Sequence, residues 1–261
     1  MPKPNPILEP VLVALARAMQ ALATPYCLIG ALVPELLLDV PLPRRTNDAD
    51  AVVLVPTLAD FDRIKEDLKR YGFRALELPY RLLHESGGRL DLLPYSRQIA
   101  PNDTLVLAPE LTFTVTGFDQ IAAAAIHVEL PTGHRIPLVP VPLYVLLKLV
   151  AFSDRVRWKD PAGALWCLYH YAADDDRRFG LEHGAAFVPY EFTTAYLAGL
   201  DARAYFSKEL RRVVEPALRR LEEDPVAAEM IAAEVDWRTA EGESLHPIGG
   251  AFCWFRAGLG V

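Results

Sequence analysis

Two aspartates separated by one residue stand where the sequence most plainly offers chemistry. Asp48 and Asp50 open an apolar run that extends from Val52 to Val55. Side chains two residues apart on a strand share one face of the sheet, so both carboxylates project side by side if the strand begins at Asp48. Two carboxylates at such close range repel each other unless a positive charge lies between them. A divalent metal ion, Mg²⁺ or Mn²⁺, is the expected partner, because hard cations prefer carboxylate and phosphate oxygens.

A third carboxylate lies in a later apolar run. Asp91 stands between Leu90 and Leu92, so the leucines face one side of a strand and Asp91 faces the other. An unpaired charge on a buried strand is costly, and a shared metal ion would offset it. The sequence therefore predicts a metal site of Asp48, Asp50 and Asp91. The simpler alternative is that Asp-x-Asp pairs arise by chance among 34 acidic residues and cap helices or line turns.

The elements that must position these acids follow from the spacing of apolar residues. Helical spacing predicts an amphipathic first helix, and a short apolar run closed by Gly30 predicts a buried strand. Gly87 and Gly88 are typical of a two-residue hairpin turn between two strands. The expected helices are 7–23, 31–39 and 58–71, and the expected strands are 26–29, 49–55, 81–86, 89–95, 111–116, 125–130 and 134–139.

The composition changes near residue 140. Beyond Pro142 the pattern is almost wholly helical. We therefore expect an α+β fold in two domains, a mixed sheet with helices over residues 1–140 and a mainly helical domain over residues 141–261. The expected helices of the second domain are 142–155, 161–173, 190–222 with breaks, 225–235 and 247–258.

The order of these motifs resembles a known family. Ile29-Gly30-Ala31, then Arg45-Thr46-Asn47-Asp48-Ala49-Asp50, then Arg89-Leu90-Asp91-Leu92-Leu93 is similar to the DNA polymerase β-like nucleotidyltransferase superfamily. Within it, the chain resembles the AbiEii/AbiGii-type group, whose toxin members belong to bacterial toxin–antitoxin systems. Leu147-Lys148-Leu149-Val150-Ala151, Arg155 and Lys159-Asp160 are similar to a further segment of that group.

This resemblance implies a nucleotidyltransferase-like sheet and a Mg²⁺-dependent enzyme that moves a nucleotide from a nucleoside triphosphate to an acceptor hydroxyl and releases pyrophosphate. Asp48 and Asp50 would hold two metals, and Asp91 would hold the one nearer the acceptor and help to deprotonate it. The nucleotide-binding residues that it implies are Gly30, Ala31, Arg45, Thr46, Lys148, Arg155, Lys159 and Asp160.

Some positions depart from the pattern or have simpler interpretations. Ala31 stands where the family usually has Ser or Gly, so a hydroxyl contact to the triphosphate is missing. Asp160 before Pro161 is also typical of a helix N-cap. Lys148 and Lys159 have the alternative of a solvated or ion-paired lysine. His84 is interpreted as a surface residue.

Several acceptors and roles remain open at this stage. The resemblance implies an RNA 3′ end such as that of tRNA, a protein hydroxyl or a small molecule as acceptor, and an antitoxin protein as a partner. The alternative is a catalytically weak binding module on the same scaffold that senses nucleotide or docks a partner.

Composition limits the remaining classes. A net charge of −7 argues against a general nucleic-acid coat protein. The pairs Arg211-Arg212 and Arg219-Arg220 are interpreted as the solvated face of a helix. No apolar run approaches the roughly 20 residues of a membrane span, so we expect no membrane partner. With no signal-peptide pattern, and with Cys27, Cys167 and Cys253 expected to be buried thiols, the predicted location is cytoplasmic.

Overall fold

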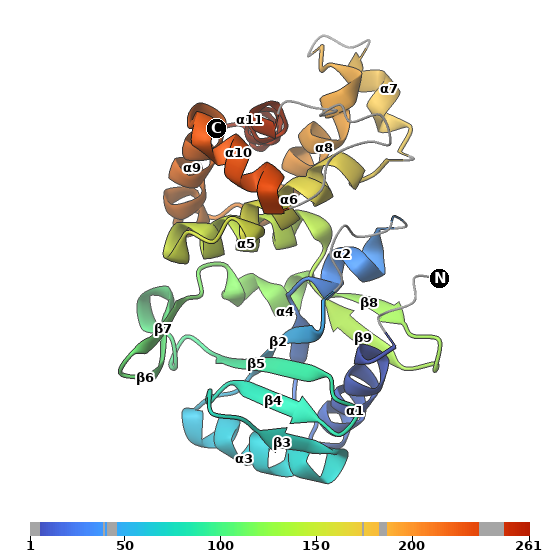
Figure 1. Ribbon diagram of the computed structural model, residues 1–261, viewed down its shortest axis with the longest axis vertical. Coiled ribbons are helices and arrows are strands. Elements are labelled where there is room, and N and C mark those ends of the chain that lie inside the picture. The colour runs from blue at the N-terminus through green and yellow to red at the C-terminus, as the bar shows by residue number, and fades with distance from the viewer. Residues whose placement is uncertain (1–5, 39, 41–45, 174, 183–186, 235–247) are drawn as a thin grey trace. The chain divides into compact units, whose positions relative to one another are not determined.

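The computed structural model describes residues 6–38, 40, 46–173, 175–182, 187–234 and 248–261 (Figure 1). The chain divides into two compact units, Met1–Pro140 and Val141–Val261. The first combines a mixed sheet with helices, and the described part of the second contains helices only. The predicted α+β fold class is thus confirmed.

A seven-stranded mixed sheet forms the centre of the first unit, in the order β3-β4-β5-β2-β1-β9-β8. Strand β2 runs parallel to β5, and β1 runs parallel to β9, while the other neighbours are antiparallel. A separate antiparallel pair consists of β6 and β7. The strands are β1 Tyr26–Leu28, β2 Asp48–Leu54, β3 Phe73–Ala75, β4 Arg81–His84, β5 Arg89–Tyr95, β6 Thr104–Ala108, β7 Leu111–Thr114, β8 Ile126–Glu129 and β9 Arg135–Leu138.

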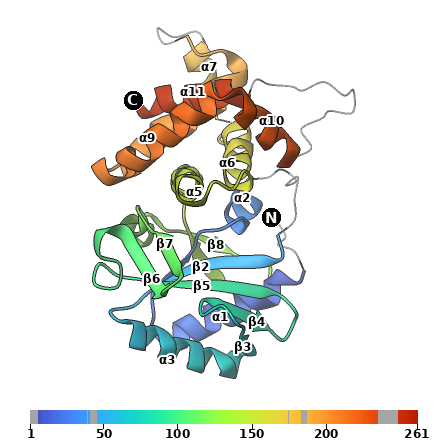
Figure 2. The same cartoon turned by 60° about the vertical axis from the view of Figure 1, so that its left-hand side comes forward.

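One face of the sheet is apolar and carries the core of the first unit. Ala49, Ala51 and Val53 of β2 alternate with residues of the opposite face and are fully buried. Helix α1 packs on β2, β5 and β9, and α3 packs on α1 and β3. Figure 2 shows both helices on the same side of the sheet. The helices of this unit are α1 Leu8–Ala21, α2 Leu32–Leu37, α3 Leu58–Leu68 and α4 Ile121–Ala124, with short 3₁₀ turns at Lys69–Tyr71, Pro101–Asp103 and Phe118–Gln120.

The second unit is a bundle in which α8 and α11 cross at a point without side chains. A Cβ on Gly199 of α8 would lie 2.2 Å from the carbonyl oxygen of Phe255, and one on Gly258 of α11 would lie 2.3 Å from that of Tyr196. Glycine therefore permits the close approach. The helices are α5 Val141–Arg155, α6 Lys159–His170, α7 Arg177–Glu182, α8 Thr193–Ala202, α9 Lys208–Glu223, α10 Pro225–Glu234 and α11 Ile248–Leu259, with 3₁₀ turns at Tyr190–Phe192 and Arg203–Tyr205.

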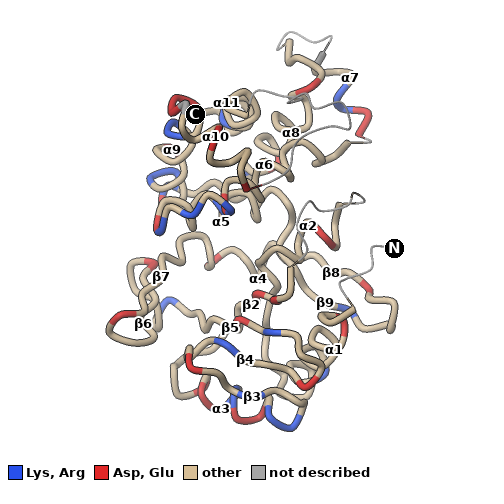
Figure 3. Tube along the Cα trace, viewed as in Figure 1, with Lys and Arg blue, Asp and Glu red and all other residues tan. Residues whose placement is uncertain are grey.

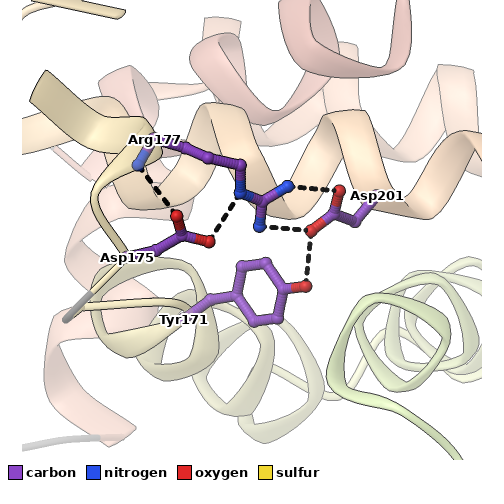
Figure 4. Close-up of polar contacts among 4 residues, drawn as sticks. All are labelled: Tyr171, Asp175, Arg177 and Asp201. Atoms are coloured by element: carbon purple, nitrogen blue, oxygen red, sulfur yellow. Dashed lines mark hydrogen bonds and ion pairs between the residues drawn. The ribbon is translucent and has the colours of Figure 1, made fainter. Parts of the chain in front are cut away.

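An ion network ties the segment after α6 and the start of α7 to α8 (Figure 4). Two guanidinium nitrogens of Arg177 each donate at 3.0 Å to Asp201, and Nε donates to Asp175. The hydroxyl of Tyr171 donates to Asp201 at 2.7 Å. The hydrogen bonds from Arg177 lower the pKa of Asp201. One arginine therefore joins the segment at Asp175 to helix α8.

Several local predictions are wrong. Strand β4 ends at His84, so the connection to β5 is 85–88 and not a two-residue turn. His84 is buried, with its ring centroid 4.9 Å from that of Phe73. Cys253 is exposed, whereas Cys27 and Cys167 are buried free thiols. Burial raises the pKa of Cys27 to about 12, which leaves this thiol unreactive at neutral pH.

The basic residues of helix α9 were predicted to form a solvated face, and this holds for some of them. Arg211 and Arg219 both pair with Glu215 on the exposed face. Arg220 instead lies over the rings of Phe152 and Trp158. No helix in the described ranges is long and apolar enough to cross a membrane.

Candidate functional site

The strand register places three carboxylates on one face of the sheet. In the parallel pair β2–β5, Asp50 is the partner of Asp91, and Asp48 is the partner of Arg89. Partners in register point to the same side, and so do residues two apart on one strand. Asp48, Asp50 and Asp91 therefore share the face opposite the apolar core. Figure 3 shows acidic positions on β2 and β5 beside basic positions on β4 and β5.

Gly30 makes room for one of these carboxylates. A Cβ at Gly30 would lie 1.8 Å from Oδ2 of Asp50 and 2.4 Å from its Cγ. The amide of Ile29 donates to the carbonyl oxygen of Asp50 at 3.0 Å, which fixes the chain before Gly30 against β2. The glycine that ends the first predicted strand is thus required by the position of Asp50, whatever else it contacts.

Thr46 orders the start of β2. Its hydroxyl lies 2.8 Å from Oδ1 of Asp48 and 3.1 Å from the carbonyl oxygen of Asp48. The hydroxyl can donate one proton, so it holds the Asp48 side chain close to the backbone that precedes the strand. Asp48 therefore enters the sheet in a defined orientation.

Arg81 holds the third carboxylate. Its Nε and one terminal nitrogen donate to the two oxygens of Asp91, both at 2.7 Å, in a bidentate ion pair. Arg81 and Asp91 are register partners on β4 and β5, and their side chains are 27% and 12% exposed. The hydrogen bonds with Asp91, and more weakly the charge of Asp48, raise the pKa of Arg81. The face thus carries a fixed positive charge among its three acids.

The donor set fits a hard divalent cation in kind. All three side chains offer carboxylate oxygens, which suit Mg²⁺ and Mn²⁺. The missing Cβ of Gly30 leaves the Asp50 carboxylate space on this face. In the arrangement present, no three His, Cys, Asp or Glu side chains of the described residues form a group that could hold a metal ion. Asp91 faces Arg81 instead, so these residues would hold a cation only with Asp91 turned from its guanidinium.

The predicted nucleotide-binding residues fall into two sets. Ala31 precedes α2 as its N-cap residue, beside Gly30, and Thr46 adjoins Asp48. Arg45 lies outside the described residues, as does Arg44. The others, Lys148, Arg155, Lys159 and Asp160, belong to the helical unit.

In the helical unit Asp160 is the centre of an ion cluster. Its side chain is fully buried, and Lys148 donates to Oδ1 at 2.9 Å. Nε of Arg155 lies 3.5 Å from Oδ2. Helix α6 begins at Lys159 with Trp158 as its N-cap, so the interpretation of Asp160 as an N-cap is wrong. Lys148 and Arg155 are held by Asp160, and Lys159 is exposed.

Arg81 is the functional candidate that sequence reasoning missed. It stands at the start of a predicted strand, and its neighbours Leu82 and Leu83 drew attention only as apolar residues. The available signal was an arginine on the strand paired with the one that carries Asp91. This signal identifies Arg81 as the partner of Asp91 only when the actual hairpin register is known, because that register places the two residues opposite each other.

No protein-family model matches the chain, and no curated protein matches it. Among solved structures, it is similar to an antigenic nucleotidyltransferase-like protein from Paracoccidioides brasiliensis, with 15% identity over 90% of this chain and 96% of that one and a TM-score of 0.46. Antibiotic-resistance factor ANT(2'')-Ia shows 14% identity over 81% and 91% with a TM-score of 0.36. CdnE cyclic dinucleotide synthase from Elizabethkingia meningoseptica shows 14% identity over 98% and 90% with a TM-score of 0.28.

Proposed function

We propose that the protein is a metal-dependent nucleotidyltransferase whose site consists of Asp48, Asp50 and Asp91. The observation that carries the proposal is the β2–β5 register, which sets Asp50 opposite Asp91 and leaves Asp48 on the same face. Arg81 brings one positive charge to a sheet face that carries three acids, so a divalent cation would offset more of the repulsion among them. The resemblance of the three motifs to nucleotidyltransferases supports the same assignment.

The residues divide the work of binding and catalysis. Asp48 and Asp50 would hold Mg²⁺, with Asp91 as the third ligand. When bound, the metal neutralises the triphosphate and strengthens the electrophilic character of the α-phosphorus. Gly30 would keep the Asp50 carboxylate in place, because that side chain occupies the space where a Cβ would stand. Thr46 would limit the movement of the Asp48 side chain through its hydrogen bond to Oδ1.

The reaction is an in-line displacement at the α-phosphorus. The acceptor hydroxyl oxygen forms a bond to phosphorus while the bond to the bridging oxygen of the β-phosphate breaks, and pyrophosphate leaves with the electron pair. We assign to Asp91 the hydroxyl proton, because it is the carboxylate that the resemblance places nearest the acceptor. The acceptor that we propose is an RNA 3′ end such as that of tRNA, or a protein hydroxyl.

The toxin role belongs to the same proposal. It predicts that expression of the active chain slows growth of a host without an antitoxin and that Asp50→Asn relieves the effect. Harmless expression of a chain that transfers nucleotide in vitro would remove the toxin role and leave the enzyme.

Incubation with each of the four nucleoside triphosphates, labelled at the α-phosphate, tests the activity. Total RNA and cell lysate serve as acceptors in the presence of Mg²⁺. We expect labelled RNA or protein with the native chain, and a loss of at least about 10²-fold in Asp50→Asn, since one carboxylate ligand of the metal that stabilises the transferring phosphoryl group is removed. Asp62→Asn is the matched control, because Asp62 is a 69% exposed acid on α3 that pairs with Lys65.

The outcomes separate the two functions. Label transfer that requires Asp50 but not Asp62 supports the enzyme. Nucleotide binding with Mg²⁺ but no labelled product in any acceptor fraction would favour the binding module. The binding module is tested as the alternative because Ala31 lacks the hydroxyl that would contact the triphosphate.

A further inference from the structure

Arg81 is held rigidly at the edge of the acidic face. Its amide donates to the carbonyl oxygen of Leu78 at 2.9 Å, and its carbonyl oxygen accepts from the amide of Leu76 at 3.0 Å. The carbonyl oxygen of Tyr80 accepts from the amide of Leu92 at 2.8 Å. The guanidinium carbon lies 5.8 Å from the centroid of the Tyr80 ring. Backbone and side chain therefore both fix where the positive charge lies.

The Tyr80 ring is itself supported. It meets the ring of Phe113 on β7 edge to face, with centroids 5.4 Å apart. Edge-to-face contact is one of the favoured geometries of aromatic pairs and stabilises the position of the Tyr80 ring. The guanidinium thus has a backing surface on one side and Asp91 on the other.

The pair with Asp91 uses the carboxylate fully on one edge. Two parallel N–H···O bonds match the guanidinium fork to both oxygens, which is the strongest arrangement available to this pair. A divalent cation that binds Asp91 would meet the same oxygens beside a fixed positive charge. A guanidinium and a divalent cation bound to the same carboxylate are close together, and their positive charges repel strongly in a partly buried site. Arg81 and the cation therefore compete for Asp91.

We infer that Arg81 is an internal counter-ion that competes with the divalent metal for Asp91. It holds the acids together in the metal-free chain and weakens metal binding until a nucleotide arrives. The triphosphate then offers the released guanidinium a second bidentate anion, so metal and nucleotide bind cooperatively. This role rests on the proposed function, and it makes Arg81 a positioning residue.

Manganese binding measures the competition without any need for turnover. The full-length native chain, Arg81→Gln and Arg81→Lys are titrated with Mn²⁺, and free Mn²⁺ is followed by electron paramagnetic resonance. We expect Arg81→Gln to bind Mn²⁺ at least tenfold tighter, and Arg81→Lys to lie between, because lysine keeps the charge but cannot form the fork. Arg70→Gln is the matched control, since Arg70 forms an exposed ion pair with Asp67.

Cooperativity supplies the second measurement. A non-hydrolysable nucleoside triphosphate should tighten Mn²⁺ binding by the native chain more than by Arg81→Gln, in which no guanidinium is left to transfer. The melting temperature in EDTA should fall in Arg81→Gln and recover with Mn²⁺ further than in the native chain. If Arg81→Gln does not fold, Arg81→Lys decides the outcome by the direction of its Mn²⁺ affinity.

The failures are distinguishable. Mn²⁺ binding that is lost in Asp50→Asn but unchanged or weaker in both Arg81 variants overturns the role of Arg81 and leaves the proposed function intact. Mn²⁺ binding that does not depend on Asp50, or no binding by any of these proteins, overturns the proposed site and the role of Arg81 with it.

Discussion

The replacement of Gly30 by alanine probes the acidic face with one methyl group. The added Cβ would lie 1.8 Å from Oδ2 and 2.5 Å from Cβ of Asp50, and real Cβ contacts essentially never fall under 3.0 Å. The carboxylate must therefore move by about 1 Å or more, a displacement that costs on the order of 10²-fold in rate at a catalytic group. Overpacking of this kind lowers stability by about 1–3 kcal/mol.

The assay combines Mn²⁺ titration with thermal unfolding. We expect Mn²⁺ affinity to fall at least tenfold and the melting temperature to fall by about 2–12 °C, given roughly 2–4 °C per kcal/mol for a chain of this size. Gly180→Ala is the control, because nothing lies within 4 Å of its Cβ position on α7. Native Mn²⁺ affinity in Gly30→Ala would refute the contribution of Asp50 to a metal site.

Three further predictions concern stability. Asp160→Ala should lower the free energy of unfolding by about 3–5 kcal/mol in urea, because Lys148 loses its buried partner. Burial lowers the pKa of His170 from 6.5, so the unfolded chain binds that proton first, and stability should fall as pH drops below 6.5, with the slope reduced in His170→Gln. Gly199→Ala should lower the melting temperature, since its Cβ would lie 2.2 Å from the carbonyl oxygen of Phe255.

Each of these has a contrary result. A loss under 1 kcal/mol in Asp160→Ala would mean that the Lys148 pair is not stabilising. An equal pH slope in native and His170→Gln chains would assign the slope to other groups. An unchanged melting temperature in Gly199→Ala, compared with Gly180→Ala, would mean that α8 and α11 separate without penalty.

The strands that carry the acids could be predicted because their pattern is local. Asp48 and Asp50 alternate with buried Ala49 and Ala51, and Asp91 lies between buried Leu90 and Leu92. Such alternation fixes which side chains face the core before any partner strand is known. The helical second half could likewise be predicted from the helical spacing of its apolar residues and from the change in composition near residue 140. The ion cluster at Asp160 could not be predicted, because the cluster joins residues from two helices.

The partner of Asp91 could not be predicted, because it depends on turn length. A two-residue turn at Gly87-Gly88 would have set His84 opposite Asp91. The actual connection, 85–88, closes with hydrogen bonds between His84 and Gly88 and between Gly87 and His84, and this moves Arg81 to that position. The local sequence allows more than one turn length here, so the strand register is known only from the three-dimensional structure.

The short elements missed by pattern have the same cause. Strand β3, of three residues, has only Phe73 buried and exists through its pairing with β4. Helix α7 begins two residues after Asp175, and the pairs of Arg177 with Asp175 and Asp201 anchor its start. Such elements owe their stability to tertiary contacts more than to their own propensity.

Anomalous diffraction from crystals grown with Mn²⁺ and a non-hydrolysable nucleoside triphosphate tests the central claim most directly. We predict a manganese peak within about 2.0–2.2 Å of carboxylate oxygens of Asp48 and Asp50, with the triphosphate on the same face of the sheet. Manganese bound only to carboxylates elsewhere, with these aspartates free of metal and nucleotide, would contradict the account.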